Sequence, residues 1–372
     1  MNFEFSDDQK ALGAQARRYL ADKCPTTAVR AILEGAEPYD KALWKGLAEM
    51  GFLGVVIPEE YGGLGLSYLE LCLIAEELGR ALAPVPFSSS VFLATEFLLV
   101  AGSDAQKSQW LPKLAAGEAI GTFAHAERVG AVTPKTIQLA VNDGKATGTK
   151  TAVPDGEIAD FAIVSARSGL GGVSLYLVDL HAPEVTRTSQ ETIDPSRGHA
   201  SLTFAGAPAQ LLGTAGEGWS ILERVFDRAA VLTAFEQIGG ADRALEMARD
   251  YALERMAFGR PIGSFQAIKH MLADMYVSAT LARSNGYYGA WALSTGAAEL
   301  PQAAASARVA ATQAFQHCAK NNIQVHGGMG FTWAFDCHLF YRRSNLLALG
   351  LGALSTWEDA LIQRLRARNV AA

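Results

Sequence analysis

Four cysteines carry the most reactive side chains of this 372-residue sequence. They are Cys24, Cys72, Cys318 and Cys337, and no two of them form a C-x-x-C pair or share a regular separation. Zinc sites and disulfide frameworks depend on such spacings. The thiols therefore predict neither a metal site nor a disulfide network, and they fit a reducing compartment.

Charge and hydropathy argue against a nucleic-acid-binding protein, a secreted protein and a membrane protein. The sequence has 32 Lys and Arg against 38 Asp and Glu, a formal net charge of −6, so no overall positive field attracts a nucleic acid. Its beginning, MNFEFSDDQK, lacks the basic and apolar pattern of a signal peptide. No apolar run approaches the roughly 18 residues that cross a membrane. We expect a cytoplasmic protein with neither nucleic-acid nor membrane partners.

Three segments of different periodicity must position the functional side chains. Residues 1–118 have helical spacing of apolar residues, beginning where Ser6 can cap the first helix. Residues 119–210 contain short runs rich in Val, Ile, Phe and Thr between turn clusters, which predict strands. Helical spacing returns over residues 211–372, where the alanine-rich stretch 297–314 would allow close helix approach. We expect an α+β protein with an N-terminal all-α domain, a small middle β-barrel or sandwich domain and a C-terminal helical bundle.

Four stretches of sequence resemble the acyl-CoA dehydrogenase family of flavoproteins, in the same order along nearly the whole chain. They are residues 47–84 (LAEMGFLGVVIPEEYGGLGLSYLELCLIAEELGRALAP), 215–245, 251–275 (YALERMAFGRPIGSFQAIKHMLADM) and 324–343 (QVHGGMGFTWAFDCHLFYRR). The resemblance implies that the bundle has four helices. It also implies FAD-dependent α,β-dehydrogenation of an acyl-CoA thioester to the 2-enoyl-CoA, a dimer or tetramer, and an electron-transferring flavoprotein as acceptor. An oxidase that passes electrons to oxygen stays open.

The resemblance assigns candidate cofactor residues in the C-terminal segment. Arg255 matches the family arginine that reaches the FAD pyrophosphate of a neighbouring subunit, a role that suits a guanidinium fork, with an arginine of the helix surface as the alternative. Phe258 and Gln266 resemble residues on the adenosine side of the cofactor, with plain interface packing as the alternative.

A second group matches the family turn where backbone approaches the pyrophosphate. It consists of Gln324, Gly327 and Gly328, although three glycines in four residues also suit a helix end. We interpret His326, which lies between them, as a structural turn residue.

The carboxylate that removes the α-proton in the family is missing here. A gapless match places Leu351 at the usual glutamate position. Some family members carry the base instead where this sequence has Ala229. Glu236 lies about 10 Å further along the same helix face and is the remaining candidate, with a satisfied polar residue of the bundle as the alternative.

The β segment also departs from the family. Phe123 and His125 fall on one flavin-bordering stretch, and Ala126 lies in the same stretch. Ala152 and Pro154 replace a stacking Trp and a hydroxyl donor on the other stretch. The residues offered to a neighbour's FAD are thus present, whereas those around the chain's own flavin are altered.

Three functions remain open. This chain could be the partner subunit of a hetero-oligomeric dehydrogenase for steroid or other bulky acyl-CoAs, resembling that bacterial branch, with the base supplied by the other subunit. It could be a self-sufficient homo-oligomeric dehydrogenase with a relocated base. It could also be a non-catalytic scaffold of the same fold.

Overall fold

The computed structural model describes residues 5–35, 37–168 and 172–371. The chain forms two compact units. Unit 1 is helical and combines residues 1–29, 68–83 and 230–372, and unit 2 combines residues 30–67 and 84–229. Helix α7 (Gly218–Glu254) begins in unit 2 and ends in unit 1. No helix among the described residues is long and apolar enough to cross a membrane.

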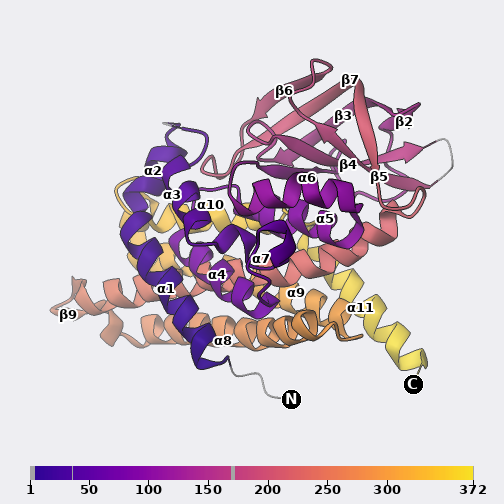
Figure 1. The fold of residues 1–372 in the computed structure, drawn as a ribbon. Helices are drawn as coiled ribbons and strands as arrows, with labels where there is room; N and C mark the ends of the chain where they lie inside the picture. The colour runs from indigo at the N-terminus through magenta and orange to yellow at the C-terminus, as the bar shows by residue number, and fades with distance from the viewer. Residues whose placement is uncertain (1–4, 36, 169–171, 372) are drawn as a thin grey trace. The chain divides into compact units, whose positions relative to one another are not determined.

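Unit 1 consists of long helices, coloured indigo and then orange to yellow in Figure 1. Ser6 and Gln9 form a capping box at the start of the first helix, which confirms the cap expected from the sequence. The helices of this unit, besides the second part of α7, are α1 (Asp7–Lys23), α4 (Tyr68–Ala81), α8 (Gln266–Thr295), α9 (Leu300–His326), α10 (Cys337–Leu347) and α11 (Leu354–Ala371). Between α7 and α8 lie a short hairpin of β8 (Met256–Ala257) and β9 (Arg260–Pro261) and then the 3-10 turn η4 (Ile262–Ser264). The 3-10 turn η5 (Gly327–Phe331) follows α9.

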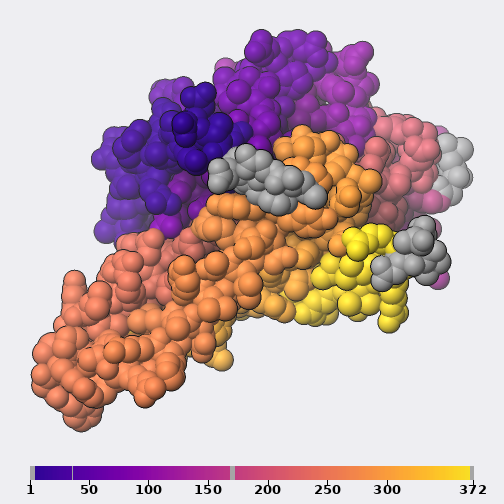
Figure 2. All heavy atoms as spheres, turned by 90° about the horizontal axis from the view of Figure 1, so that it is seen from below, coloured from indigo at the N-terminus to yellow at the C-terminus, as the bar shows by residue number. Residues whose placement is uncertain are grey.

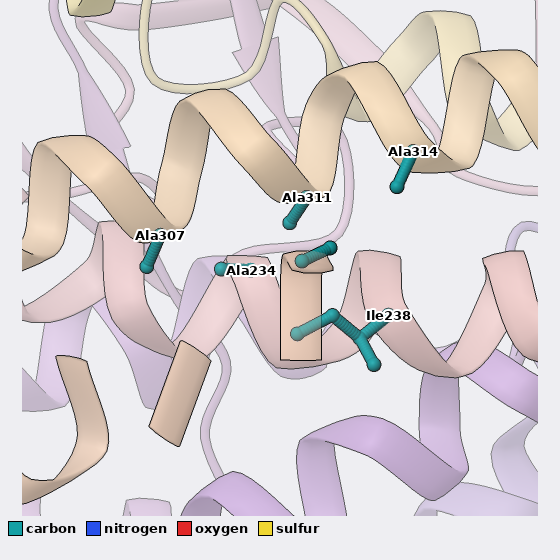
Figure 3. Packing of buried hydrophobic residues seen from close by; sticks show 6 residues of the cluster. Ala234, Ile238, Ala307, Ala311 and Ala314 are labelled. Atoms are coloured by element: carbon teal, nitrogen blue, oxygen red, sulfur yellow. The ribbon is translucent and has the colours of Figure 1, made fainter. Parts of the chain in front are cut away.

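The core of unit 1 depends on small residues. Ala307, Ala311 and Ala314 of α9 point toward Ala234 and Ile238 of α7 (Figure 3), and all five are fully buried. Helix backbones can approach closely where the facing side chains are this small. The close helix approach expected from the alanine-rich stretch is confirmed.

Helices α4 and α7 cross still more closely, at glycines. A Cβ atom built on Gly79 would lie 1.8 Å from the backbone oxygen of Glu236, and one built on Gly239 would lie 1.8 Å from that of Glu76. No real Cβ occupies such positions, so both glycines are required by the crossing.

Unit 2 contains the β domain, drawn in magenta tones in Figure 1. Strand β4 pairs with β2 and with β5, so the path β4-β2-β3-β7-β5 closes on itself as a small barrel. Strand β1 extends it beside β4, and β6 extends it beside β7. The strands are β1 (Gly121–Ala124), β2 (Ala140–Asn142), β3 (Lys145–Pro154), β4 (Phe161–Ser168), β5 (Val173–Asp179), β6 (Val185–Gln190) and β7 (His199–Leu212).

Helices and short turns complete unit 2. They are α2 (Thr26–Leu33, whose first residues lie in unit 1), α3 (Lys41–Glu49), the 3-10 turns η1 (Phe52–Gly54) and η2 (Glu59–Tyr61), η3 (Ser88–Thr95), α5 (Glu96–Ala101) and α6 (Asp104–Ala115). Within the segment expected to be α-helical, η3 is a π-helix and α5 follows it directly. Strand β5 differs from a one-sided strand: Ser174 and Val178 on its second face are also buried, because the start of α7 packs against Ser174.

Candidate functional site

The two sequence stretches expected to border a flavin lie side by side in unit 2. The Thr122 hydroxyl donates to the carbonyl oxygen of Pro154 at 2.5 Å, and the Thr151 N–H donates to that of Ala126 at 2.8 Å. These bonds join the end of β1 to the end of β3. The structure therefore brings together the altered positions that the sequence placed in separate stretches.

The end of β3 has a strained backbone. Ala152 and Asp155 both have positive φ values, +50° and +53°, which non-glycine residues rarely adopt. The Gln190 side chain accepts from the Ala152 N–H at 2.7 Å, and the Asp155 N–H donates to the oxygen of Gly198 at 2.8 Å. Such outliers concentrate at functional sites, where the surrounding structure holds them in place.

His125 lies among aromatic rings at the end of β1. Its ring stacks on buried Phe123, with centroids 5.2 Å apart and an interplanar angle of 22°. Trp219 and Phe226, from the first turns of α7, lie 5.7 and 6.0 Å from the His125 ring. His125, Trp219 and Phe226 are all half-buried.

A buried lysine sits beneath this aromatic group. The Lys150 ammonium, fully buried, donates to the backbone oxygen of His125 at 3.0 Å, to Glu127 Oε1 at 2.7 Å and to Ser165 Oγ at 3.2 Å. Burial lowers the pKa of Lys150 to about 8, although the bond to Glu127 opposes this shift. Burial and the Lys150 charge lower the pKa of His125 to about 3, so its imidazole is neutral at physiological pH.

The candidate residues of the C-terminal segment are exposed on unit 1. Phe258 is 95% exposed at the tip of the β8–β9 hairpin, with a φ of +52°. Gln266, in the first turn of α8, lies 3.5 Å from His270 by the distance between their side-chain nitrogens. Arg255 immediately precedes the hairpin and is exposed. This hairpin lies at one end of the orange helices in Figures 1 and 2.

The glycine turn lies near the same end of α7. The Tyr251 ring, one helical turn before Arg255, stacks on His326 at 4.0 Å. His326 is buried and its Nδ1 lies 2.8 Å from the backbone oxygen of Asn322, as expected for a structural residue. Gln324 is exposed on the last turn of α9.

Two glycines of this turn have open space beside them. Gly327 ends α9 with a φ of +61°, which explains a glycine there. Gly328 has no such backbone requirement, and a Cβ built on it would meet no atom of the described chain within 4 Å. Nothing in the chain itself therefore explains the second glycine, which leaves room for a group from outside.

The two positions at which the resemblance expects a catalytic carboxylate hold apolar side chains. Leu351 is 6% exposed, and Trp357 donates through its indole nitrogen to the Leu351 oxygen at 3.0 Å. Ala229 is fully buried. Among the described residues, no group of three or more His, Cys, Asp or Glu side chains could hold a metal ion.

Glu236 is buried in the helices of unit 1 beside two buried arginines. Its Oε1 lies 3.8 Å from Nη1 of Arg343, which also donates to the backbone oxygen of Leu82 at 3.2 Å. Arg308 bonds the neighbouring Gln237 at 2.7 Å, and burial lowers the pKa of Arg308 to about 10 despite the nearby Glu236 charge. Sequence reasoning missed both arginines, because their helical spacing does not distinguish a buried arginine from an exposed one.

Comparisons with known proteins fit this architecture. Residues 6–118 match the acyl-CoA dehydrogenase N-terminal domain, and residues 216–364 match the C-terminal domain. Acyl-CoA dehydrogenase IpdE2 of Mycobacterium tuberculosis is 34% identical over 91% of this chain and 91% of its own length.

Two solved structures are similar over almost the entire chain. A variant of the Tcur3481-Tcur3483 steroid ACAD has a TM-score of 0.88 at 30% identity, covering 98% of this chain and 99% of that one. The ChsE4-ChsE5 complex from Mycobacterium tuberculosis has a TM-score of 0.89 at 27% identity, with 98% and 99% covered. With both terminal domains matched on either side of a closed β-barrel, the chain belongs to the acyl-CoA dehydrogenase family, whose cofactor is FAD.

Proposed function

We propose that this chain is one subunit of a hetero-oligomeric dehydrogenase that converts a steroid or other bulky acyl-CoA to its 2-enoyl-CoA, with the catalytic carboxylate supplied by a partner subunit. One observation carries the proposal. Both positions at which the family resemblance expects the base, Leu351 and Ala229, hold buried apolar side chains. Neither side chain can accept a proton, whereas removal of the α-proton requires a positioned base.

Glu236 supports the alternative of a self-sufficient enzyme, but its surroundings suit it poorly for that role. The carboxylate is buried, and the charges of Arg343 and Arg308 lie beside it. A buried carboxylate beside buried arginines fits a charge pair within the helical core. We therefore assign Glu236 a structural role and keep the relocated base as the competing hypothesis.

The residues present fit FAD. Gly328 leaves open space that a Cβ would fill, and Phe258 and Arg255 are exposed. We propose that Arg255, Gln324, Gly327 and Gly328 hold the pyrophosphate of a neighbouring subunit's FAD, and that Phe258 and Gln266 contact its adenosine side. Phe123 and His125 would border the flavin of this chain. Bound FAD would supply the acceptor for the hydride from the β-carbon, and an electron-transferring flavoprotein would reoxidise it.

The relatives support the choice of substrate and assembly. One similar structure is named as a steroid ACAD, and another is a complex of two differently named chains. We infer from them a bulky, steroid-like acyl group and a hetero-oligomer for this chain. A homo-oligomer is the alternative.

The test compares the chain purified alone with the chain purified together with the product of a neighbouring gene. We expect no turnover of a steroid acyl-CoA by the chain alone, and turnover by the pair. The flavin-to-chain ratio, measured by absorbance in both preparations, separates a subunit that takes part in FAD binding from a scaffold.

One variant, Glu236→Gln, and the flavin content separate the remaining outcomes. Glu236→Gln should leave turnover by the pair within about threefold of the wild type, because the base lies elsewhere. Turnover by the lone chain that Glu236→Gln abolishes would instead establish the self-sufficient enzyme. A chain that binds no flavin in either preparation would be a scaffold.

A further inference from the structure

The hydrogen bonds below His125 determine which of its ring nitrogens carries the proton. An ammonium group has three hydrogens and no acceptor. Lys150 places all three, on the His125 backbone oxygen, Glu127 and Ser165. Glu127 in turn accepts from the backbone N–H groups of Gln138 at 2.8 Å and Leu139 at 3.1 Å, so its carboxylate is held in place beside Lys150.

Ser165 transmits this arrangement to the imidazole. Its hydroxyl accepts from Lys150 and lies 2.9 Å from His125 Nδ1. Ser165 is fully buried, and among the described residues no acceptor besides His125 Nδ1 lies within hydrogen-bond distance of its hydroxyl. Ser165 therefore donates to Nδ1, and the proton of the neutral ring resides on Nε2.

The Nε2–H group points away from this network. No hydrogen bond from Nε2 to a described residue is formed, and the nitrogen is not among the buried unpartnered atoms. It is thus an accessible donor, flanked by the half-buried rings of Trp219 and Phe226. Aromatic rings with one fixed donor suit a planar heterocycle that carries a hydrogen-bond acceptor.

We propose that His125 is a fixed hydrogen-bond donor, through Nε2–H, to the flavin ring system, and that Ser165 and Lys150 are positioning residues that hold its tautomer. The proposal rests on the proposed function, in which this chain borders a flavin. His125 would then supply a hydrogen-bond donor to the flavin site, where Ala152 and Pro154 provide no side-chain hydroxyl.

Two variants of His125 test the donor. His125→Phe keeps a flat ring without a donor, and His125→Gln keeps a side-chain N–H. The variants are prepared with the partner subunit, the flavin is removed, and FAD is titrated back while its fluorescence is followed. We expect His125→Phe to weaken FAD binding about tenfold and His125→Gln to recover binding to within about threefold.

The flavin midpoint potential tests the positioning residues. A donor to the flavin ring favours the reduced, more electron-rich form, so its loss lowers the potential. We expect a shift toward negative potential in His125→Phe and a smaller shift in the same direction in Ser165→Ala, because Ser165 acts through His125. A purely structural role of Ser165 would not shift the potential in this way.

Three outcomes would overturn the assignment. Wild-type affinity and potential in His125→Phe would show that the donor is not used. A His125→Gln variant as weak as His125→Phe would show that ring shape matters and the donor does not. Failure of the wild-type complex itself to take up FAD would overturn the proposed function as well, so the two failures are distinguishable.

Discussion

At the scale of single residues, Phe258 is held in a conformation that an aromatic side chain disfavours. Phe258 and Gly259 both have positive φ, +52° and +77°, as in the two-residue hairpin turn that usually contains Asn-Gly. A non-glycine residue there costs roughly 1 kcal/mol, and the ring is 95% exposed, with an edge contact to Phe265 at 6.1 Å between ring centroids.

Replacement of Phe258 should therefore separate stability from binding. We expect Phe258→Asn to raise the free energy of unfolding by about 1 kcal/mol, because asparagine tolerates this conformation, while FAD affinity falls. Thermal denaturation and FAD titration measure the two effects. Phe258→Leu is the control and should not gain stability; equal stability of all three proteins would contradict the strain argument.

His125 makes stability depend on pH. Its pKa is about 3 in the folded chain, lowered by burial and then by Lys150, against an ordinary value of 6.5. Between these values the unfolded chain binds a proton that the folded chain does not, so stability falls as the pH drops below about 6.5. The loss approaches about 1.4 kcal/mol per pH unit.

His125→Phe and His125→Gln should both remove this component, since neither side chain titrates. Urea unfolding at pH 8, 6 and 5 measures it, with the values at pH 8 as the reference. Parallel curves for the wild type and both variants would show that the folded His125 binds its proton as readily as the unfolded one.

At the scale of elements, the crossing of α4 and α7 is set by Gly79 and Gly239, where an added Cβ would overlap a backbone oxygen. We expect Gly79→Ala or Gly239→Ala to cost at least about 2 kcal/mol. Gly13→Ala on α1 is the matched control, because its Cβ would meet Leu73 at an ordinary 3.6 Å and alanine favours a helix by roughly 0.5–1 kcal/mol. Chemical denaturation of the three variants measures these changes in the free energy of unfolding. A loss at Gly79 or Gly239 no larger than that at Gly13 would contradict the prediction.

The elements themselves were largely predictable from local pattern. The Ser6 cap and the alanine face of α9 each follow from the pattern within one short segment of sequence. Both predictions are confirmed. The π-helix η3 was not predictable, because its apolar spacing resembles that of an α-helix. The Lys150–Ser165–His125 network was not predictable either, since it joins β3, β4 and the residue after β1, whose register no short sequence window contains.

At the scale of the whole molecule, large apolar side chains on α8 remain uncovered. Tyr276, Val277 and Leu281 are 63%, 53% and 59% exposed. Clustered apolar side chains on a surface mark an interaction site. We expect Leu281→Lys to lower the molar mass of the assembly in light scattering, whereas Thr188→Lys on β6 adds the same charge without effect. An unchanged mass would exclude α8 from the subunit interface.

Contacts within unit 1 join segments that the ribosome makes at very different times. Arg283 of α8 binds Glu76 of α4 through two hydrogen bonds, although the two residues are 207 positions apart. At about 5–20 residues per second, a ribosome needs roughly ten to forty seconds between them. During that time α4 can pack against α1, which precedes it, but its contacts with α7 and α8 cannot form until those helices have been made. Nascent chains should therefore recruit a chaperone over this interval, and should release it once the sequence through α9 has emerged.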